Sequence, residues 1–305
     1  DQVIFEKGEV VKNDGTPYKV YTPYSRKWIE SWGNEPPISY PSENLLHHLE
    51  SNENQPQTSL SNLGFKKSNI KLPTFITDER IMDEYEATRN YPALDSTSRV
   101  GTALRFGTIS IRKLAMKAAE RSEITYFKEL IWREFFMQIL WHFPHTVERS
   151  FKPQYDRIEW RNNQDEFDRW CAGKTGYPFV DAGIKELNAT GFMHNRVRML
   201  AGSFLCKHLL IDWRWGEAYF AEKLMDFEKS SNVGNWQWVA GCGVDAAPYF
   251  RIFNPTDQIK KFDKQHDYLK KWVPNYQELD YPKPLVDHKR ARERCLATYK
   301  AALNA

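Results

Sequence analysis

The densest group of indoles in this chain lies in Ile211-Asp212-Trp213-Arg214-Trp215 and Asn232-Val233-Gly234-Asn235-Trp236-Gln237-Trp238. These two stretches hold four of the eleven tryptophans, beside an Asp and two Asn side chains. Trp is an unusual core filler, because a buried indole N–H needs a hydrogen-bond partner. Its ring offers a flat face for stacking and a π-system that can lose an electron. The two stretches therefore indicate a protein that binds a light- or redox-active cofactor.

Length and charge limit the classes of protein to consider. With 305 residues, the chain can form one large domain or two small ones, each with a sizeable core. Its 43 basic and 40 acidic side chains leave a net charge of only +3, so nucleic-acid binding would need a local patch. No apolar run approaches the roughly 20 residues of a membrane span, and the polar N-terminus does not resemble a signal peptide.

The cysteines and histidines do not predict a metal site. The four cysteines are scattered along the chain, at Cys171, Cys206, Cys242 and Cys295. Without a CxxC pair they are expected to be reduced thiols, as in a cytoplasmic protein. His142 and His145 have a possible ligand spacing, but no carboxylate or thiol completes a shell, which favours a pair at the end of a helix.

The spacing of apolar residues is helical nearly throughout from Thr77 onward, at i, i+3 and i+4 positions. Strand patterns, repeats and a dinucleotide-type glycine motif are not found. The chain is therefore predicted to be all-α, with a short extended segment over residues 1–33, a linker over 34–73 and a helical domain over 74–305. The predicted helices cover residues 44–50, 81–89, 109–119, 123–141, 164–171, 180–189, 194–210, 215–227 and 285–303.

Two segments have features of a phosphate site. Gly173-Lys174-Thr175 resembles the end of a phosphate loop, but Asp168 stands where that motif needs Gly, which favours a plain loop between helices. Ser96-Thr97-Ser98-Arg99 precedes Val100-Gly101-Thr102 and a helix-forming region. Hydroxyls, backbone N–H groups and an Arg at a helix start suit a pyrophosphate, although a simple N-cap has the same appearance.

A second polar group opens the helix that follows Gly191. Asn195, Arg198 and Met199 share one helical face, which brings an amide, a guanidinium and a thioether together. If Arg198 is buried it needs a counter-charge, and Asp226 and Glu228 are both candidates. A solvated basic face is the alternative.

Six motifs, taken in order, resemble one known family. They are Thr97-Ser-Arg-Val-Gly-Thr-Ala-Leu-Arg-Phe-Gly-Thr-Ile-Ser110, Glu129-Leu-Ile-Trp-Arg-Glu-Phe135, Gly176-Tyr-Pro-Phe-Val-Asp-Ala182, Met193-His-Asn-Arg-Val-Arg-Met199, Asn235-Trp-Gln-Trp238 and Asp245-Ala-Ala-Pro-Tyr-Phe-Arg-Ile-Phe-Asn-Pro-Thr256. Together they resemble the cryptochrome/DNA photolyase family, specifically its class I cyclobutane pyrimidine dimer photolyases. The resemblance extends from about Tyr85 to beyond Gln258.

The resemblance implies a helical domain that holds a U-shaped FAD, active as the reduced anion. The FAD-binding residues that it implies are Tyr85, Thr97, Ser98, Arg99, Val100, Gly101, Arg133, Arg198, Asp226, Glu228 and Asn232. The implied catalytic residues are Glu129, Asn232 and the electron-carrying Trp160, Trp213 and Trp236. The implied contacts to the lesion and to DNA are Arg89, Glu129, Trp132, Asn195, Arg196, Met199, Trp238 and Gln258. No metal is implied.

The same resemblance implies a deoxyribodipyrimidine photolyase, a carbon–carbon lyase that acts as a monomer on UV-damaged DNA, in the cytoplasm or at the nucleoid. Plant cryptochromes typically carry Asp at the position of Asn232, and (6-4) photolyases typically carry His at those of Asn195 and Met199. A cryptochrome-like photoreceptor without repair activity is the alternative. The chain departs from the family at Gly101, where Ser is common, and at Tyr126, where Trp is common.

The family's N-terminal α/β domain, which carries an antenna chromophore, is largely missing from this sequence. Residues 1–33 resemble the end of that domain and the start of the linker. We therefore expect the flavin domain of a longer protein, without an antenna pigment of its own.

Overall fold

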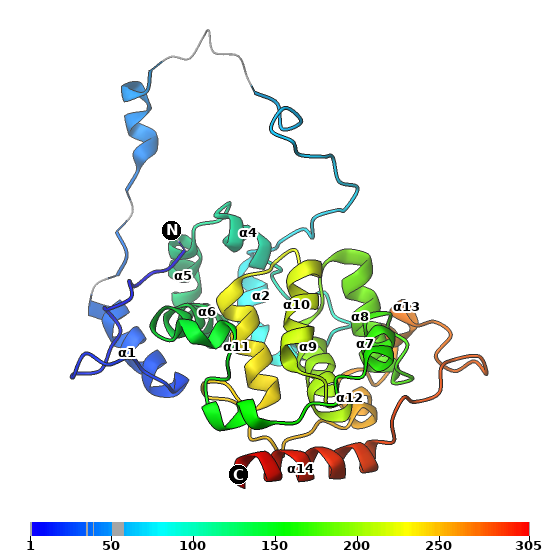
Figure 1. Ribbon diagram of the computed structural model, residues 1–305. Coiled ribbons are helices and arrows are strands. Elements are labelled where there is room, and N and C mark those ends of the chain that lie inside the picture. Colours follow the sequence, from blue (N-terminus) through cyan, green and yellow to red (C-terminus); the bar gives the residue numbers. More distant parts are fainter. Residues whose placement is uncertain (1, 35, 39, 51–57, 305) are drawn as a thin grey trace.

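The computed structural model describes residues 2–34, 36–38, 40–50 and 58–304 of the chain. Within those ranges helices supply nearly all of the regular structure, and an isolated bridge pairs Val11 with Pro17. The prediction of an all-α fold is thus confirmed. Figure 1 shows the helices gathered into one body with α14 along its lower edge, while residues 40–50 and 58–72 loop away from it.

The helices of the body alternate with short 3-10 turns and one π-helical segment, and a further 3-10 helix, η1, lies in the part of the chain that loops away. In chain order they are α1 (Tyr21–Asn34), η1 (Ser42–His48), α2 (Glu79–Asp83), α3 (Tyr85–Thr88), α4 (Gly101–Phe106), α5 (Ile111–Ala119), α6 (Thr125–His142), η2 (Pro144–Val147), η3 (Pro153–Arg157), α7 (Gln164–Cys171), α8 (Pro178–Thr190), α9 (Asn195–Ser203), η4 (Phe204–His208), α10 (Trp213–Lys223), α11 (Lys229–Ala240), α12 (Pro255–Phe262), α13 (Asp267–Trp272) and α14 (His288–Asn304).

The N-terminal segment corrects one prediction, because residues 21–34 form a helix that packs on α6. Tyr21, Tyr24 and Trp28 recur at helical spacing and are buried, so α1 presents an aromatic stripe to the core. The Trp28 indole N–H donates to Glu134 Oε1 at 2.7 Å, and the backbone N–H of Ile4 donates to Oε2 of the same carboxylate at 2.6 Å. Only residues before α1 fit the predicted extended segment, including the turn in which Gly15 adopts a left-handed conformation.

Several helices also begin, end or break at positions that the sequence did not predict. The predicted helix over residues 81–89 is split at Glu84 into α2 and α3, and the one over 194–210 changes from α9 to the π-helical η4 at Phe204. Helix α10 begins at Trp213, where the Asp212 side chain caps it by accepting from the N–H of Arg214. Helices α11, α12 and α13 were not predicted at all.

Helix α11 contains the second tryptophan stretch and occupies the centre of the body. It contacts α6, α9 and α10, and so joins the apolar cluster built around α1 and α6 to the one built around α8 and α9. It begins after the N-cap Glu228 and ends at Gly241, whose φ of 91° is a left-handed conformation that suits glycine. Among the described residues, no helix has the length and apolar character needed to cross a bilayer.

Candidate functional site

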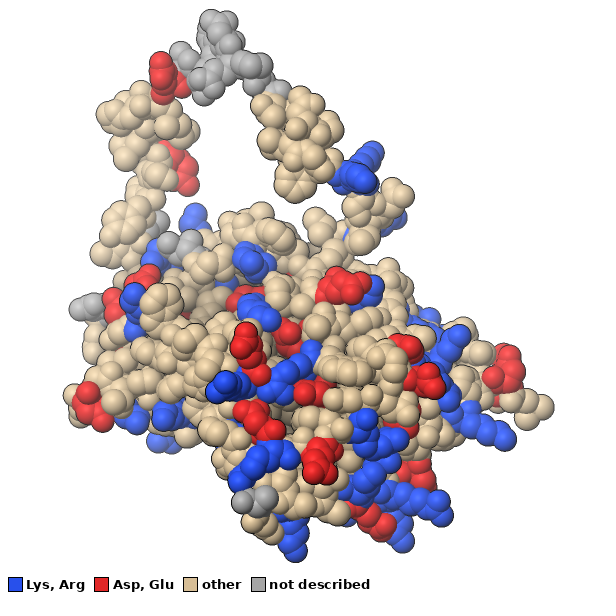
Figure 2. All heavy atoms as spheres, in the orientation of Figure 1, with Lys and Arg blue, Asp and Glu red and all other residues tan. Residues whose placement is uncertain are grey.

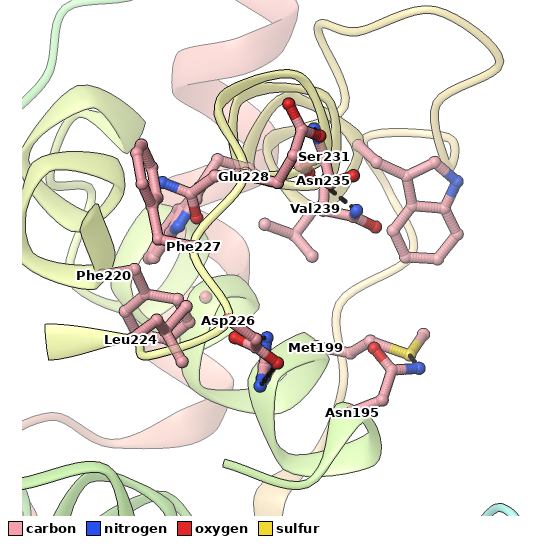
Figure 3. A pocket seen from close by; sticks show the side chains of 15 residues that line it. Asn195, Met199, Phe220, Leu224, Asp226, Phe227, Glu228, Ser231, Asn235 and Val239 are labelled. Carbon is pink, nitrogen blue, oxygen red and sulfur yellow. Dashed lines mark hydrogen bonds and ion pairs between the residues drawn. The ribbon is translucent and has the colours of Figure 1, made fainter. Parts of the chain in front are cut away.

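Two adjoining hollows lie between α4, α6, α9 and α11. The first, which we name the Trp236 hollow, has a volume of about 110 Å³ and is drawn in Figure 3. The second, the Ser98 hollow, has a volume of about 250 Å³. Both share three lining residues, Asn195, Arg198 and Asp226, so the hollows meet there.

An ion pair marks the junction of the two hollows. Arg198 donates to both Asp226 carboxylate oxygens, at 3.2 and 2.8 Å, and its Nε donates to the carbonyl of Met193 at 2.6 Å. The two side chains are only 25% and 19% exposed, so each depends on the other for charge compensation. Asp226 is therefore the partner of Arg198, as the resemblance implied, whereas residue chemistry alone left Asp226 and Glu228 both open.

Gly101 allows this pair to lie close to α4. A Cβ atom at Gly101 would lie 2.9 Å from Cβ of Asp226 and 3.1 Å from its Oδ2. Because real Cβ contacts are not that short, a larger residue would displace the carboxylate. Glycine at position 101, where Ser is common in the family, thus leaves room for the side chain of Asp226.

Glu228 has a different role, as the N-cap of α11. Its carboxylate accepts hydrogen bonds from the backbone N–H groups of Ser230 and Ser231, each within 2.9 Å. Burial raises the pKa of Glu228, but the hydrogen bonds from Ser230 and Ser231 outweigh burial and leave the pKa below its ordinary value. The ionised carboxylate lines the edge of the Trp236 hollow in Figure 3.

Asn232 lies one turn into α11 and is held by a residue that sequence reasoning missed. Its Nδ2 donates to the carbonyl oxygen of Glu217 at 3.0 Å and to Oε1 of the same residue at 2.9 Å. Lys229 in turn lies 3.1 Å from that carboxylate. Because both partners on Glu217 are acceptors, the side-chain atom of Asn232 that faces them is the nitrogen. Oδ1 of Asn232 is therefore the atom left for a ligand. Glu217 stands in another helix, fifteen positions away, and no local spacing in the sequence connects the two.

The Ser98 hollow collects nearly all of the remaining residues that the resemblance implied for FAD. Ser98 is buried, and its hydroxyl is 3.0 Å from that of Tyr126. Arg99 has a φ of 52°, an uncommon conformation for a residue with a side chain, and such conformations cluster at ligand clamps. The implied FAD ligands that line this hollow are Tyr85, Thr97, Ser98, Arg99, Val100, Gly101, Arg133, Arg198 and Asp226.

Glu129 also lines the Ser98 hollow, and it forms an ion pair with Arg89. Burial raises the pKa of Glu129, while the charge and the hydrogen bond of Arg89 act in the opposite direction without cancelling the effect of burial. A raised pKa favours the protonated form of the Glu129 carboxyl group, which can donate a hydrogen bond. Arg89 and Glu129, which the resemblance implied as contacts to DNA and to the lesion, are therefore bound to each other in this structure.

Trp132 lies apart from the residues with which the resemblance grouped it. It is not among the residues that line the two hollows, whereas Trp238, Asn195 and Met199 line the Trp236 hollow. The Trp132 ring is stacked on Tyr21 of α1, with centroids 3.7 Å apart and planes 9° from parallel. One face of this indole is therefore covered. The partnership was missed because residue 21 was placed outside the helical domain.

Arginines cluster at the rim beside Glu129. Arg196 hydrogen-bonds to Asn90 and lies over the Phe262 ring at 4.3 Å. Burial lowers the pKa of Arg196, and the positive charges of Arg89 and Arg251 lower it further, so three guanidinium groups are near one another. Gln258 stands one turn before Phe262 on α12, which places it near this cluster. The part of the surface visible in Figure 2 mixes both signs, so a basic patch has to be local.

The three tryptophans proposed to carry electrons lie on adjoining segments. Trp236 is buried against α10, since a Cβ at Gly216 would lie 2.1 Å from its Cη2 atom, and Gly216 is one turn beyond Trp213. Trp213 is buried too. Trp160 is half-buried, and the next residue, Arg161, donates its N–H to the carbonyl of Leu210 at 2.7 Å, close to the start of α10. Trp236 and Trp213 are thus both buried, and Trp160, at the other end of the proposed series, is partly exposed.

Other candidates from the sequence hold no ligand site. Gly173-Lys174-Thr175 is a loop between α7 and α8 that is tied to Asp181, as predicted. Among the described residues, no group of three or more His, Cys, Asp or Glu side chains is arranged to hold a metal ion. The four cysteines are free thiols.

Comparison with known proteins identifies the family. A family model described as the FAD binding domain of DNA photolyase matches residues 126–280. The chain is similar to the deoxyribodipyrimidine photo-lyase of Escherichia coli, with 37% identity over 99% of this chain and 72% of the relative. The corresponding protein of Alkalihalophilus pseudofirmus is 35% identical over 98% of this chain and 71% of the relative.

Solved structures agree with the sequence comparison. A crystal structure of a class III photolyase from Agrobacterium tumefaciens has a TM-score of 0.88 and 36% identity, and the match covers 100% of this chain and 72% of that one. A cryptochrome from Synechocystis has a TM-score of 0.77 and 26% identity, over 97% of this chain and 70% of that one. The chain therefore belongs to the DNA photolyase family, and residues 126–280 correspond to the family's FAD-binding domain.

Proposed function

We propose that this chain uses light to return cyclobutane pyrimidine dimers in DNA to separate pyrimidines, with reduced FAD as its cofactor. The observation that carries the proposal is the pair of hollows joined at Arg198 and Asp226, with the buried Asn232 amide at one of them and an indole series leading away. The relatives named deoxyribodipyrimidine photo-lyase support it.

The residues of the two hollows fit FAD. The Ser98 hollow offers hydroxyl groups from Thr97 and Ser98 and guanidinium groups from Arg133 and Arg198, which are donors that suit phosphates. The Trp236 hollow has apolar walls, including Phe220 and Val239, that suit a flat ring system. When bound, reduced FAD supplies an electron to the dimer after absorbing light and regains it once both cyclobutane bonds have broken.

Asn232 sets the electrostatic character of the flavin site in this proposal. Glu217 fixes its Nδ2, so Oδ1 is oriented to accept a hydrogen bond from the protonated N5 of a reduced flavin. A neutral amide adds no negative charge there, whereas a carboxylate would repel an anionic flavin. The proposed active form is therefore the reduced anion.

The dimer is proposed to leave the base stack, as photolyases do with their target bases, and to lie beside the flavin ring near Asn195, which lines both hollows. Trp238 would stack on a pyrimidine, and base–aromatic stacking contributes about 1–3 kcal/mol per base. Asn195 and Met199 would line the same space. Glu129, with its raised pKa, would donate a hydrogen bond to a pyrimidine carbonyl on which charge develops. Trp132 would present the face that Tyr21 leaves uncovered.

The arginine cluster is proposed to bind the damaged strand. Arg89, Arg196 and Arg251 would contact phosphates, with Gln258 beside them. Arg251 is an addition to the residues that the resemblance implied, and the signal for it was its place in the motif Asp245–Thr256. A single chain provides the whole site, so the proposed active species is a monomer.

The test is repair of a thymine dimer in an oligonucleotide by the purified, photoreduced chain under near-UV or blue light. We expect the absorbance of intact thymine at about 260 nm to return, and E129A to lower the yield while FAD stays bound. E120Q, on an exposed residue outside both hollows, is the matched control. A protein that holds reduced FAD and repairs nothing would instead favour a photoreceptor.

A further inference from the structure

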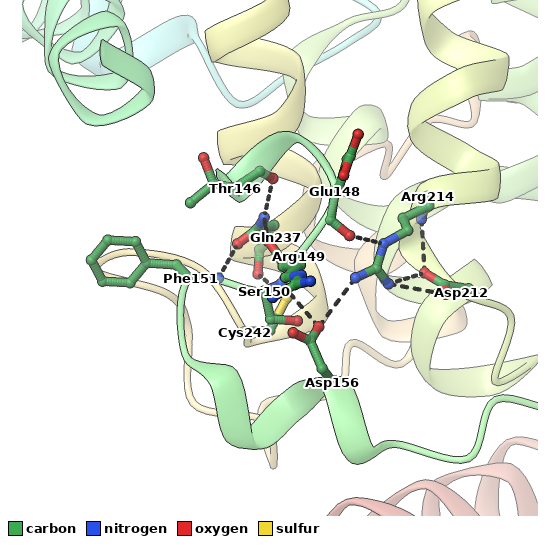
Figure 4. Close-up of polar contacts among 10 residues, drawn as sticks. All are labelled: Thr146, Glu148, Arg149, Ser150, Phe151, Asp156, Asp212, Arg214, Gln237 and Cys242. Atoms are coloured by element: carbon green, nitrogen blue, oxygen red, sulfur yellow. Dashed lines mark hydrogen bonds and ion pairs between the residues drawn. The ribbon is translucent and has the colours of Figure 1, made fainter. Parts of the chain in front are cut away.

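The middle indole of the proposed electron path carries a fixed positive charge on its face. The guanidinium carbon of Arg214 lies 4.7 Å from the centre of the Trp213 ring. Arg214 is held there by several contacts, which Figure 4 shows converging on it from different segments. It donates to the carbonyl of Glu148 at 2.6 Å, to both carboxylate oxygens of Asp212 at 3.1 Å and to Oδ1 of Asp156 at 3.1 Å. The cation is thus clamped rather than free to swing away.

This placement has opposite effects on the two redox states of the indole. A cation over the face of a neutral Trp ring is attracted by its π-electrons. Once the ring has lost an electron it is positively charged, and the same contact becomes a repulsion. Because Arg does not lose its proton in proteins, the repulsion persists at every pH of interest. Arg214 therefore disfavours the oxidised form of Trp213.

A second feature of Trp213 acts in the same direction. Its ring is 1% exposed, and its Nε1 has no hydrogen-bond partner among the described residues. A tryptophan radical cation is commonly stabilised when its indole proton moves to an acceptor, and Trp213 has none within reach. Trp160 differs, because it is half-buried and water can solvate its charge and take its proton.

We propose that Arg214 is a tuning residue. It makes the oxidised form of Trp213 less stable and so favours transfer of the electron vacancy outward to Trp160. This inference rests on the proposed function and on its indole path. Trp236 would give one electron to a light-excited oxidised flavin, Trp236 would regain one from Trp213, and Trp213 would regain one from Trp160. Trp160 then loses its indole proton to water, and a thiol reductant in solution returns one electron and one proton. No bond between heavy atoms changes.

The experiment uses the full chain loaded with oxidised FAD and carrying W160F, so that the vacancy stops at Trp213. After a laser flash, the decay of the tryptophan radical absorbance measures how easily the vacancy returns to Trp236 and is lost. We expect R214Q to slow this decay about tenfold, which corresponds to about 1.4 kcal/mol, because Trp213 then holds the vacancy more firmly. R214K retains the charge and should decay as the parent does.

D156N is the matched control, because it breaks the same ion pair as R214Q but changes the charge in the opposite direction. It leaves Arg214 less compensated, so the decay should become faster rather than slower. Thermal unfolding of the flavin-free proteins measures the structural loss, which should be larger for R214Q because that variant also loses the contacts to Glu148 and Asp212. A merely structural role for Arg214 would shift the decay of both variants in one direction.

Failure of the inference can be separated from failure of the proposed function. If the protein without these substitutions forms no tryptophan radical after the flash, the indole path is overturned, whereas the proposed function fails only if chemically reduced protein also repairs no dimer. If it forms the radical but R214Q, R214K and D156N all decay alike, only the tuning role of Arg214 is overturned. Slower decay in both R214Q and D156N also overturns it.

Discussion

Removing the charge of Asp226 tests the junction of the two hollows. In D226N the Arg198 guanidinium stays in place but loses its counter-charge in a site where it is only 25% exposed. Removing one partner from a fully buried pair costs about 3–5 kcal/mol. Because a quarter of the Arg198 side chain still meets water and its Nε keeps the Met193 carbonyl, we expect a smaller loss of about 2 kcal/mol.

The assay is thermal unfolding of the flavin-free chain followed by circular dichroism. A loss of about 2 kcal/mol should lower the melting temperature by about 3 °C in a chain of 305 residues. E222Q is the matched control, since it breaks the Glu222–Lys223 pair, whose carboxylate side chain is 70% exposed. Its melting temperature should change by less than about 1 °C, because exposed pairs contribute little.

The reasoning is refuted if D226N and E222Q melt at the same temperature. The same pair of variants should also differ in FAD content after purification. A ligand that binds only the folded state adds stability by mass action, so the difference between the variants should persist or grow when FAD is added. Equal FAD retention would show that the ion pair stabilises the fold without shaping the site.

Three further predictions concern single residues. G101A should lower the melting temperature and FAD retention, because its Cβ would lie 2.9 Å from that of Asp226, and retention equal to the parent would contradict the close fit. The pKa of Glu129 is raised in the folded state, so this group lowers stability as pH rises above the ordinary carboxyl pKa of about 4.3. The stability of E129Q relative to the parent should therefore improve between about pH 5 and pH 8, measured by urea unfolding, and a flat difference would oppose the assignment. W236F should abolish most photoreduction of bound FAD while repair by chemically reduced protein continues, and equal loss of both would refute the electron-carrying role of Trp236.

Much of the fold was readable from local patterns. Apolar positions at i, i+3 and i+4 predicted residues 164–171 as a helix, which is α7, and gave most of α5, α6 and α14 within a few residues. Helix α11 was missed because apolar and polar residues alternate around its whole circumference, and it is stabilised by burial on several sides and by the Glu228 cap. Helix α1 was missed because its aromatic stripe was assigned to the N-terminal segment of residues 1–33, and only its contact with α6 shows what that stripe packs against.

By itself, the sequence determined the helical class and the family, because ordered motifs and local periodicity can be read without knowledge of contacts. The tertiary structure decided which residues meet. It shows the implied pair of Arg198 with Asp226, and it sets Glu217 against Asn232 and Tyr21 against Trp132, which the sequence did not predict. It also placed the Arg214 charge over the Trp213 ring. Such pairings depend on how helices distant in the chain pack, and packing is a property of the whole core rather than of any segment.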